Sequence, residues 1–389
     1  MMENRYTVSP KLKYTSFALM AIGVIALGIG FSTGADRAWA NVLLNSYYFL
    51  SLAVGASFFL ALQYITQSGW SAMFKRIPEA MGTYIPVGAG ILLLFLIFGS
   101  HSVYHWTHAD AVANDELLQH KASYLNLSFM IIRYVLFVGS WVLLAGMLRK
   151  YSLREDEVGG TKYFKKSEFL SKIFIFVLAF TFTLATIDWI MSVNPHWFST
   201  LFSAKNFMTA FFHGAAIITL IAILLNRNGN LPGLNKYHLH DFSKYIFMLS
   251  IIYGYLWYSQ YFLIWYANIP EETVYYTTLI HGGWKSLFIA DIAINWAFPF
   301  LFLMLNAIAK NAKALMFTAI ILSIGQWIDL YLQIMPGSTG VNVIGFVEIG
   351  SYLGFLGLFI FVVSRSLSKA SLVPKNHPYL QESTAHKLH

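Results

Sequence analysis

The chain has 389 residues, of which 57% are hydrophobic and 11% are charged, and its mean hydropathy is +0.57. Soluble globular chains carry about 25% charged residues, so this composition excludes an ordinary soluble domain and predicts an integral membrane protein. The formal net charge of +8 does not indicate a nucleic-acid partner, because nearly all of the 26 Lys and Arg residues lie in loops on one side of the predicted spans.

Ten apolar windows are long enough to cross a bilayer, which takes about 20 apolar residues. They cover residues 14–32, 42–64, 83–100, 126–147, 172–193, 206–225, 244–265, 285–306, 313–334 and 345–365. With the N-terminus in the cytoplasm, only Arg37, Lys121, Lys205 and Lys285 fall on the outer side, and Arg133 falls within a helix. This positive-inside pattern predicts that both termini are cytoplasmic.

The first span has a second interpretation as a cleaved signal peptide, because Ala38-Trp39-Ala40 resembles a cleavage site. Asp36 and Arg37 interrupt the approach to that site, which favours a retained transmembrane helix. No soluble domain is expected between the spans, since the longest loops, 101–125 and 148–171, hold about 25 residues each.

The outer loop begins with three histidines, His101, His105 and His108, at helical spacing. Such a face can bind a metal, but no carboxylate lies at a matching offset, so we favour an interfacial polar cap and predict no metal site. The chain has no cysteine, which excludes iron–sulfur ligation and c-type haem attachment. A b-type haem would require two facing histidines within the membrane, and only His213 lies well within a span.

Apart from the tyrosines and the Lys and Arg residues at the span ends, six ionisable residues lie inside predicted spans, where each indicates a functional site by default. At about 1.5 Å per residue, all six lie within roughly 10 Å of the outer surface. They are the candidates for a proton path: Arg133, Asp188, His213, Asp291, Asp329 and Glu348. The inner halves of the spans hold neutral polar residues, so ionisable groups are confined to the outer half.

Two interpretations of these residues stay open. In the first, Arg133, Asp188 and His213 form an outward half-channel for protons, with Asp291 and Asp329 as the matching residues in the second half of the chain. In the second, Arg133 and Asp188 are a structural ion pair and His213 is a packing residue. Asp329 and Glu348 would then be partly hydrated at the membrane interface.

A short internal repeat relates the two halves of the chain. IDWIMSVNP at 187–195 matches IDLYLQIMP at 328–336, so Asp188 and Asp329 would occupy equivalent positions in two parallel four-helix bundles. The seventh span, YIFMLSIIYGYLWYSQYFLIWY, has ten aromatic residues among 22. Packing and anchoring at the interface account for such a surface without a quinone site.

Three segments together resemble one family closely. They are HSVYHWTHADAV at 101–112, IDWIMSVNPHWFSTLF at 187–202 and YLWYSQYFLIWYANIPEETVYY at 255–276. The chain resembles the polysulfide-reductase-like (NrfD-like) membrane subunits from about residue 14 to 365. Its last segment is most similar to the smaller of the two such subunits in bacterial alternative complex III.

This resemblance implies an all-α fold of ten transmembrane helices in the bacterial inner membrane. It divides the chain into a cytoplasmic N-terminus (1–13), peripheral helix 1 (14–41), a four-helix bundle of helices 2–5 (42–193), a second bundle of helices 6–9 (206–334), peripheral helix 10 (345–365) and a cytoplasmic tail (366–389).

The resemblance also implies a membrane subunit of a quinol-oxidising respiratory complex that scaffolds the complex and conducts protons. The chain would bind no cofactor itself. Its partners would be a sister NrfD-like quinone-binding subunit, periplasmic iron–sulfur and multihaem cytochrome c subunits, a terminal oxidase and membrane lipids. No quinone site is assigned to this chain, and His101, His105 and Trp257 are the candidates for contact with a quinone.

Two other functions remain open. A proton-coupled secondary transporter also fits a repeat with buried Asp, Arg and His, although no helix broken near the midplane is evident from the sequence. A membrane anchor without a proton role is the third, in which the buried charges only hold helices together.

Overall fold

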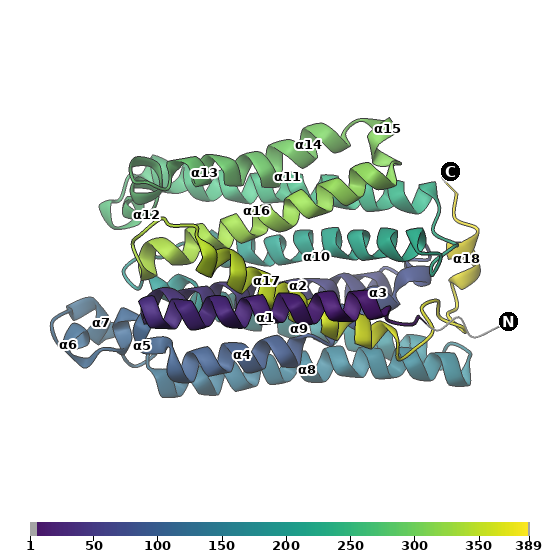
Figure 1. Cartoon of the computed structure of the whole chain (residues 1–389), viewed down its shortest axis with the longest axis horizontal. Helices are drawn as coiled ribbons and strands as arrows, with labels where there is room; N and C mark the ends of the chain where they lie inside the picture. The colour runs from purple at the N-terminus through teal and green to yellow at the C-terminus, as the bar shows by residue number, and fades with distance from the viewer. Residues whose placement is uncertain (1–5, 388–389) are drawn as a thin grey trace.

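The computed structural model of the chain describes residues 6–387, and helices account for most of them. No β-strand occurs within that range. The long helices run side by side along the longest axis of the molecule (Figure 1). The prediction of an all-α chain is therefore confirmed.

Within the described residues, nine helices or helix pairs are long and apolar enough to cross a membrane. They are α1 (Pro10–Thr33), α2 (Ala35–Ile65), α3 with α4 (Arg76–Gly82 and Ile85–Phe98), α8 (Leu127–Val158), α9 (Lys162–Trp189), α10 (Leu201–Arg227), α13 with α14 (Lys285–Ile292 and Phe298–Leu303), α16 (Ala312–Ser338) and α17 (Phe346–Leu367). Their number and composition confirm a multi-pass membrane protein.

One further long helix, α11 (Lys236–Ala267), covers the predicted span 244–265. It has 32 residues, contacts α10 and α14, and lies alongside the nine others (Figure 1). Its many tyrosines together with Ser250, Ser259 and Gln260 lower its mean hydropathy, which is why composition does not select it.

Side-chain caps fix where several of these helices begin. The side-chain oxygens of Ser9, Asn126 and Asn311 accept hydrogen bonds from the free backbone N–H groups of α1, α8 and α16. α2 begins at Ala35, ahead of the predicted start at residue 42. The carboxylate of Asp36 lies in its first turn, where the partial positive charge of a helix N-terminus favours an anion.

The most deeply buried helix, α2, lies where the two halves of the chain meet. On one side it contacts α4 and α9, and on the other it contacts α10 and α16. Gly55 makes the α2–α10 contact possible, since a Cβ atom there would lie 2.0 Å from the carbonyl oxygen of Ala210. Within the halves, α8 packs against α4 and α9, and α10 packs against α11 and α16.

The first and last spans pack against each other along a seam of small residues. A Cβ atom added at Gly23 of α1 would lie 2.3 Å from the Cα atom of Gly354 in α17. Gly350 of α17 packs against Ala26 of α1 in the same way, since a Cβ atom added at Gly350 would lie 2.4 Å from the Cβ atom of Ala26. Small residues allow two membrane helices to approach closely and gain van der Waals contact, so this seam holds α1 on the bundle.

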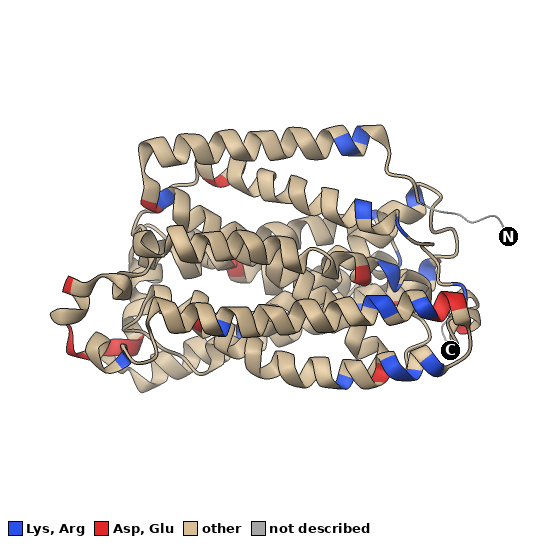
Figure 2. Cartoon of the chain, turned by 90° about the horizontal axis from the view of Figure 1, so that it is seen from below, with Lys and Arg blue, Asp and Glu red and all other residues tan. Residues whose placement is uncertain are grey.

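The two ends of the molecule differ in charge. Both termini lie at one end (Figure 1), and most Lys and Arg residues gather at that same end (Figure 2). The short helical elements that complete the fold are η1 (Ala72–Phe74), α5 (Ser100–Val103), η2 (His105–Thr107), α6 (Ala109–Ala113), α7 (Glu116–Lys121), η3 (Met191–Val193), α12 (Pro270–His281), a π-helical turn (Ala293–Ala297), α15 (Asn306–Ala309) and α18 (Leu380–Thr384).

Candidate functional site

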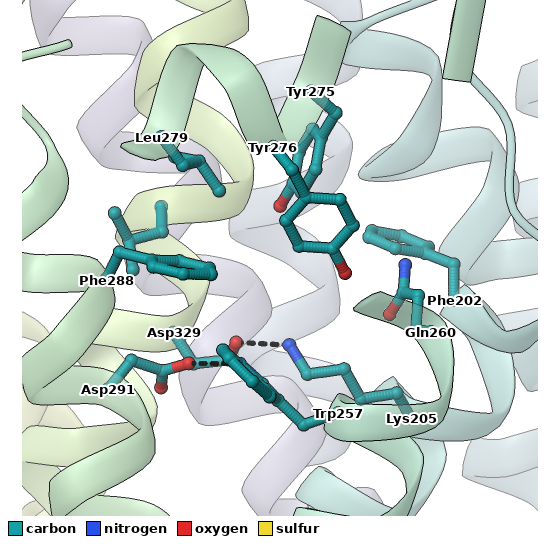
Figure 3. Close-up of a pocket in the computed structure, with 11 residues that line it drawn as sticks. Phe202, Lys205, Trp257, Gln260, Tyr275, Tyr276, Leu279, Phe288, Asp291 and Asp329 are labelled. Atoms are coloured by element: carbon teal, nitrogen blue, oxygen red, sulfur yellow. Dashed lines mark hydrogen bonds and ion pairs between the residues drawn. The ribbon is translucent and has the colours of Figure 1, made fainter. Parts of the chain in front are cut away.

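Three buried charged side chains meet between α10, α13 and α16. Lys205 is in the first turns of α10, Asp291 is near the end of α13, and Asp329 is in the middle of α16. Their exposed fractions are 6%, 2% and 2%. We name this group the buried charge cluster, and Figure 3 shows it from within the bundle. Charges this deep are costly unless they are paired, so their pairing determines what the site can do.

Lys205 and Asp329 form an ion pair across the cluster. The Nζ atom of Lys205 lies 2.5 Å from Oδ1 of Asp329. The other oxygen of Asp329, Oδ2, is buried and receives no hydrogen bond from the described residues. One carboxylate oxygen is therefore left with free acceptor capacity inside the protein, where an unmet hydrogen bond is unfavourable.

Asp291 is held by neutral donors from α11 and from its own helix. The Tyr253 hydroxyl donates to both carboxylate oxygens at 3.0 and 3.1 Å, and Nε1 of Trp257 donates to Oδ2 at 3.1 Å. Nδ2 of Asn295 donates to Oδ1 at 2.8 Å. Three donors pointing at one carboxyl group stabilise its ionised form.

A small cavity separates Asp291 from the Lys205–Asp329 pair. Its volume is about 20 Å³, which is room for one water molecule with polar partners on its walls. Tyr275 and Tyr276 of α12, Phe288 of α13 and Gln260 of α11 line the rest of the cavity (Figure 3). A hydrogen-bonded path between the two carboxyl groups is therefore short.

His213 joins the cluster through one intermediate side chain. Its Nδ1 atom lies 2.8 Å from the carbonyl oxygen of Thr209, and its Nε2 atom lies 3.0 Å from Oδ1 of Asn295. Asn295 in turn contacts Asp291. Asn295 is in the π-helical turn Ala293–Ala297, a backbone irregularity that is frequent at functional sites.

Arg133 and Asp188 form a separate site in the other half of the chain. Nε and Nη2 of Arg133 donate to the two Asp188 oxygens at 2.7 and 3.1 Å. The guanidinium also lies 3.8 Å from the ring centroid of Tyr124 and 4.3 Å from that of Phe129. Bidentate pairing and two aromatic contacts fix this arginine firmly, as the ion-pair interpretation expects. His213 is not part of this site.

Glu348 lies apart from both sites, at the start of α17. Its carboxylate accepts from Nε and Nη2 of Arg37 at 2.7 and 2.6 Å, from Nδ2 of Asn41 at 3.0 Å, and from the backbone N–H of Gly345 at 2.8 Å. These contacts connect the start of α17 to the first turns of α2. Because four hydrogen bonds, two of them from a guanidinium, hold its carboxylate, Glu348 has a structural role that joins two helices.

The structure does not bring the quinone candidates together. Trp257 donates to Asp291 of the buried charge cluster, whereas His101 and His105 are exposed in the segment between α4 and α8 in the other half. His101 borders a surface pocket of about 470 Å³ together with Trp106 and His108. Among residues 6–387, no group of three or more His, Asp or Glu side chains could hold a metal ion.

Sequence reasoning missed two features. Lys205 precedes the predicted span 206–225 by one residue and was placed with the outer-side charges, yet α10 begins at Leu201 and carries it inward. The other feature is a buried polar cluster where α3 meets α8, in which Arg76 pairs with Glu79 and Asp156 and Lys75 pairs with Glu155. The pattern KR-x-x-E at 75–79 is the local signal for one of these pairs.

A scan against protein-family models found no match, and a search of curated proteins found no similar sequence.

Proposed function

We propose that the chain is the smaller NrfD-like membrane subunit of a bacterial quinol-oxidising complex of the alternative complex III type. It crosses the inner membrane ten times, with α11 as the seventh span and helices 2–5 and 6–9 as two four-helix bundles. Its partners are the sister NrfD-like quinone-binding subunit, iron–sulfur and multihaem cytochrome c subunits and a terminal oxidase. The positions of both termini at one end of the molecule support an even number of spans.

Within that complex, the subunit scaffolds its partners and conducts protons through its second bundle. The observation that carries this proposal is the buried charge cluster. Asp291, Asp329 and Lys205 line a cavity with room for one water molecule, and the buried Oδ2 atom of Asp329 receives no hydrogen bond from the described residues. Neighbouring carboxyl groups in a water-excluded site are suited to exchanging a proton. Arg133 and Asp188 have a structural role in this proposal.

The first test is a reduced-minus-oxidised spectrum of the tagged chain, extracted gently from its native membrane. A c-type haem band is expected because a cysteine-free chain can acquire it only from a bound partner. A flat spectrum from an intact, monodisperse preparation contradicts the respiratory assignment. In the intact complex, Asp291→Asn should lower proton release per quinol oxidised, whereas unchanged release would contradict the relay.

A proton-coupled secondary transporter is the second candidate, and one observation favours it. The eighth span contains the π-helical turn Ala293–Ala297 beside Asp291, and transporters place irregular helix segments beside their binding sites. Purified chain alone in liposomes distinguishes the two functions. Substrate uptake driven by a proton gradient supports the transporter, while activity that requires the assembled complex supports the respiratory subunit.

A further inference from the structure

Asn295 lies between two ionisable side chains, His213 and Asp291, and forms a hydrogen bond with each. The nitrogen of its amide donates hydrogen bonds and the oxygen accepts them. These hydrogen bonds run from Thr209 through His213 and Asn295 to Asp291, and the groups at both ends determine which atoms donate and which accept. At the far end, Nδ1 of His213 faces the Thr209 carbonyl oxygen, which can only accept, so Nδ1 carries a proton. At the near end, Asp291 receives Tyr253 and Trp257 as donors.

In the orientation present in the structure, the Asn295 oxygen faces Nε2 of His213 and its nitrogen faces Asp291. An amide oxygen can only accept, so Nε2 must carry a proton as well. His213 is then a doubly protonated imidazolium, and Asp291, which accepts from three donors, is an ionised carboxylate. The pair is neutral in total, as a buried pair must be to avoid an uncompensated charge.

A half-turn of the amide about its last side-chain torsion exchanges its two ends, which are nearly identical in shape. The nitrogen then donates to Nε2 of His213, which must be unprotonated. The oxygen then faces Asp291, which must carry a proton. The proton bound at Nε2 in the first state is bound at an Asp291 oxygen in the second. The total number of protons bound by His213 and Asp291 is the same in both states.

We propose that Asn295 is a relay switch that couples the protonation of His213 to that of Asp291. Both orientations exclude a neutral His213 beside an ionised Asp291, because either orientation would leave two acceptors facing each other. The pair therefore always holds at least one mobile proton. This inference deepens the proton relay of the proposed function and rests on it for its physiological role.

Asn295 packs directly against the backbone of α16, because residue 325 is a glycine and puts no side chain against the amide. A Cβ atom at Gly325 would lie 2.3 Å from the Asn295 oxygen. The π-helical turn contacts α16, and from it the Asn295 side chain reaches His213 of α10. The other charged groups facing the pair, Lys205 of α10 and Asp329 of α16, form an ion pair with each other. Tyr253 of α11 is a neutral donor.

The test measures protonation directly in the full chain in its native membrane, without turnover. Nitrogen-15 NMR of labelled histidine distinguishes the three imidazole states, and infrared spectroscopy detects a protonated carboxyl group. The signals are assigned by their loss in His213→Gln and Asp291→Asn. In the wild type, the imidazolium fraction of His213 and the protonated fraction of Asp291 should sum to one or more at every pH. A neutral His213 beside an ionised Asp291 overturns the proposal.

Two variants give opposite expectations. In Asp291→Asn, the new amide can donate to the Asn295 oxygen, so His213 should lose its imidazolium signal by about tenfold and keep its proton on Nδ1. In Asn295→Leu, the two groups should titrate independently and their sum should fall below one at alkaline pH. An imidazolium that persists in Asp291→Asn, or coupling that persists in Asn295→Leu, contradicts the switch.

Asn206→Leu and Asp188→Asn are matched controls, since Asn206 is a buried amide bonded only to the Phe202 carbonyl among the described contacts and Asp188 is a buried carboxylate paired with Arg133. Both should leave the His213 signal unchanged, and a change in either would contradict a specific role for Asn295. These signals are measured without quinol, whereas the haem spectrum tests the respiratory assignment. Either proposal can therefore be contradicted while the other holds.

Discussion

The pairing of Lys205 with Asp329 shows how a single residue can determine the charge of the whole cluster. Lys205 is the only Lys or Arg side chain that forms an ion pair with either carboxyl group among the described residues. Without it, Asp291 and Asp329 would be two carboxyl groups beside one small cavity. Two buried like charges in such a site cannot both stay ionised, so one would take up a proton.

Replacing Lys205 by Met should therefore destabilise the chain by about 3–5 kcal/mol, because Asp329 is left buried without its partner. The double variant Lys205→Met, Asp329→Leu should recover most of that loss, since it removes both charges. Thermal unfolding of the detergent-solubilised protein measures the two effects in a double-mutant cycle. Additive losses in the double variant would argue that the two side chains do not interact.

The Arg133–Asp188 pair gives a second prediction, which separates structure from function. Asp188→Asn should lower stability by about 3–5 kcal/mol, because the fixed guanidinium loses its counter-charge. In the fraction of the complex that assembles, proton release per quinol oxidised should match the wild type. A specific loss of proton release in well-assembled Asp188→Asn would return this residue to the proton path.

At the scale of elements, the contact between α16 and the π-helical turn depends on one glycine. A Cβ atom at Gly325 would lie 2.3 Å from the Asn295 oxygen and 2.6 Å from Cγ2 of Ile294. We expect Gly325→Ala to cost about 1–3 kcal/mol through overpacking and to separate α16 from the turn.

Gly28→Ala is its matched control, because nothing lies within 4 Å of a Cβ atom there and the residue is in an exposed part of helix α1. Unfolding midpoints of the two variants make the comparison. Alanine should be neutral or slightly stabilising at Gly28, since it favours helix by up to about 1 kcal/mol. Equal destabilisation of both would show that the contact is not tight.

The C-terminal segment is docked by a histidine that must stay neutral. His377 accepts a hydrogen bond from the backbone N–H of Tyr379 through Nδ1, and its ring lies 5.4 Å from that of Phe164. Burial, with a further contribution from Lys75 and Arg76, lowers the pKa of His377 to about 2. The docked state thus binds fewer protons than the released state, whose histidine has a pKa of about 6.5.

The C-terminal segment should therefore dock less stably as the pH is lowered. Its free energy of docking is constant above about pH 6.5 and weakens by about 1.4 kcal/mol for each pH unit below that value. Hydrogen-exchange protection of residues 370–385, measured relative to the intrinsic exchange rate at each pH, should therefore fall between pH 7.5 and pH 5. His377→Gln, which cannot titrate, should show equal protection at both pH values. Unchanged protection in the wild type would show that His377 does not control docking.

The internal repeat relates two aspartates correctly but does not predict the helices that surround them. It predicted equivalent positions for Asp188 and Asp329, and both are buried and paired with a cation. The elements around them differ, however. α9 ends at Trp189, whereas α16 continues through Pro336 to Ser338. The cation comes from α8 in one case and from α10 in the other, because a nine-residue match carries no information about partner helices.

At the scale of the whole molecule, the number of spans depends on α11. If α11 crosses the membrane, the loop after α10 and the loop before α16 lie on the same side. If it does not, they lie on opposite sides. The cysteine-free sequence allows single introduced thiols at Asn228 and Ala307, which are both exposed, to report this directly.

We expect both thiols to react with a membrane-impermeant reagent only from the cytoplasmic side, and a thiol at exposed Asn114 to react only from the outside. Mass-tag labelling of right-side-out and inverted vesicles provides the measurement. Labelling of Ala307→Cys from the outside would reduce the number of spans to nine.

The sequence was sufficient for features that repeat over many residues, and insufficient for single contacts. Apolar length and the asymmetry of Lys and Arg predicted an all-helical membrane protein. They could not place Lys205, because hydropathy assigns a lysine at the edge of a window to the outside, whereas its long side chain reaches back to Asp329. The role of Asn295 was equally hidden, since it depends on a π-helical turn and on a glycine in another helix.

The glycine seam between α1 and α17 also has a consequence for the order of biosynthesis. A ribosome releases a chain from its N-terminus, so α1 enters the membrane first, and its principal packing partner is the last span to be made. Until Gly350 and Gly354 emerge, most of α1 faces lipid or the insertion machinery. The first helix to be synthesised is thus the last to complete its packing. A chain that terminates before residue 350 would leave α1 with its contact to α2 but without its principal packing partner, and so exposed to recognition by quality control.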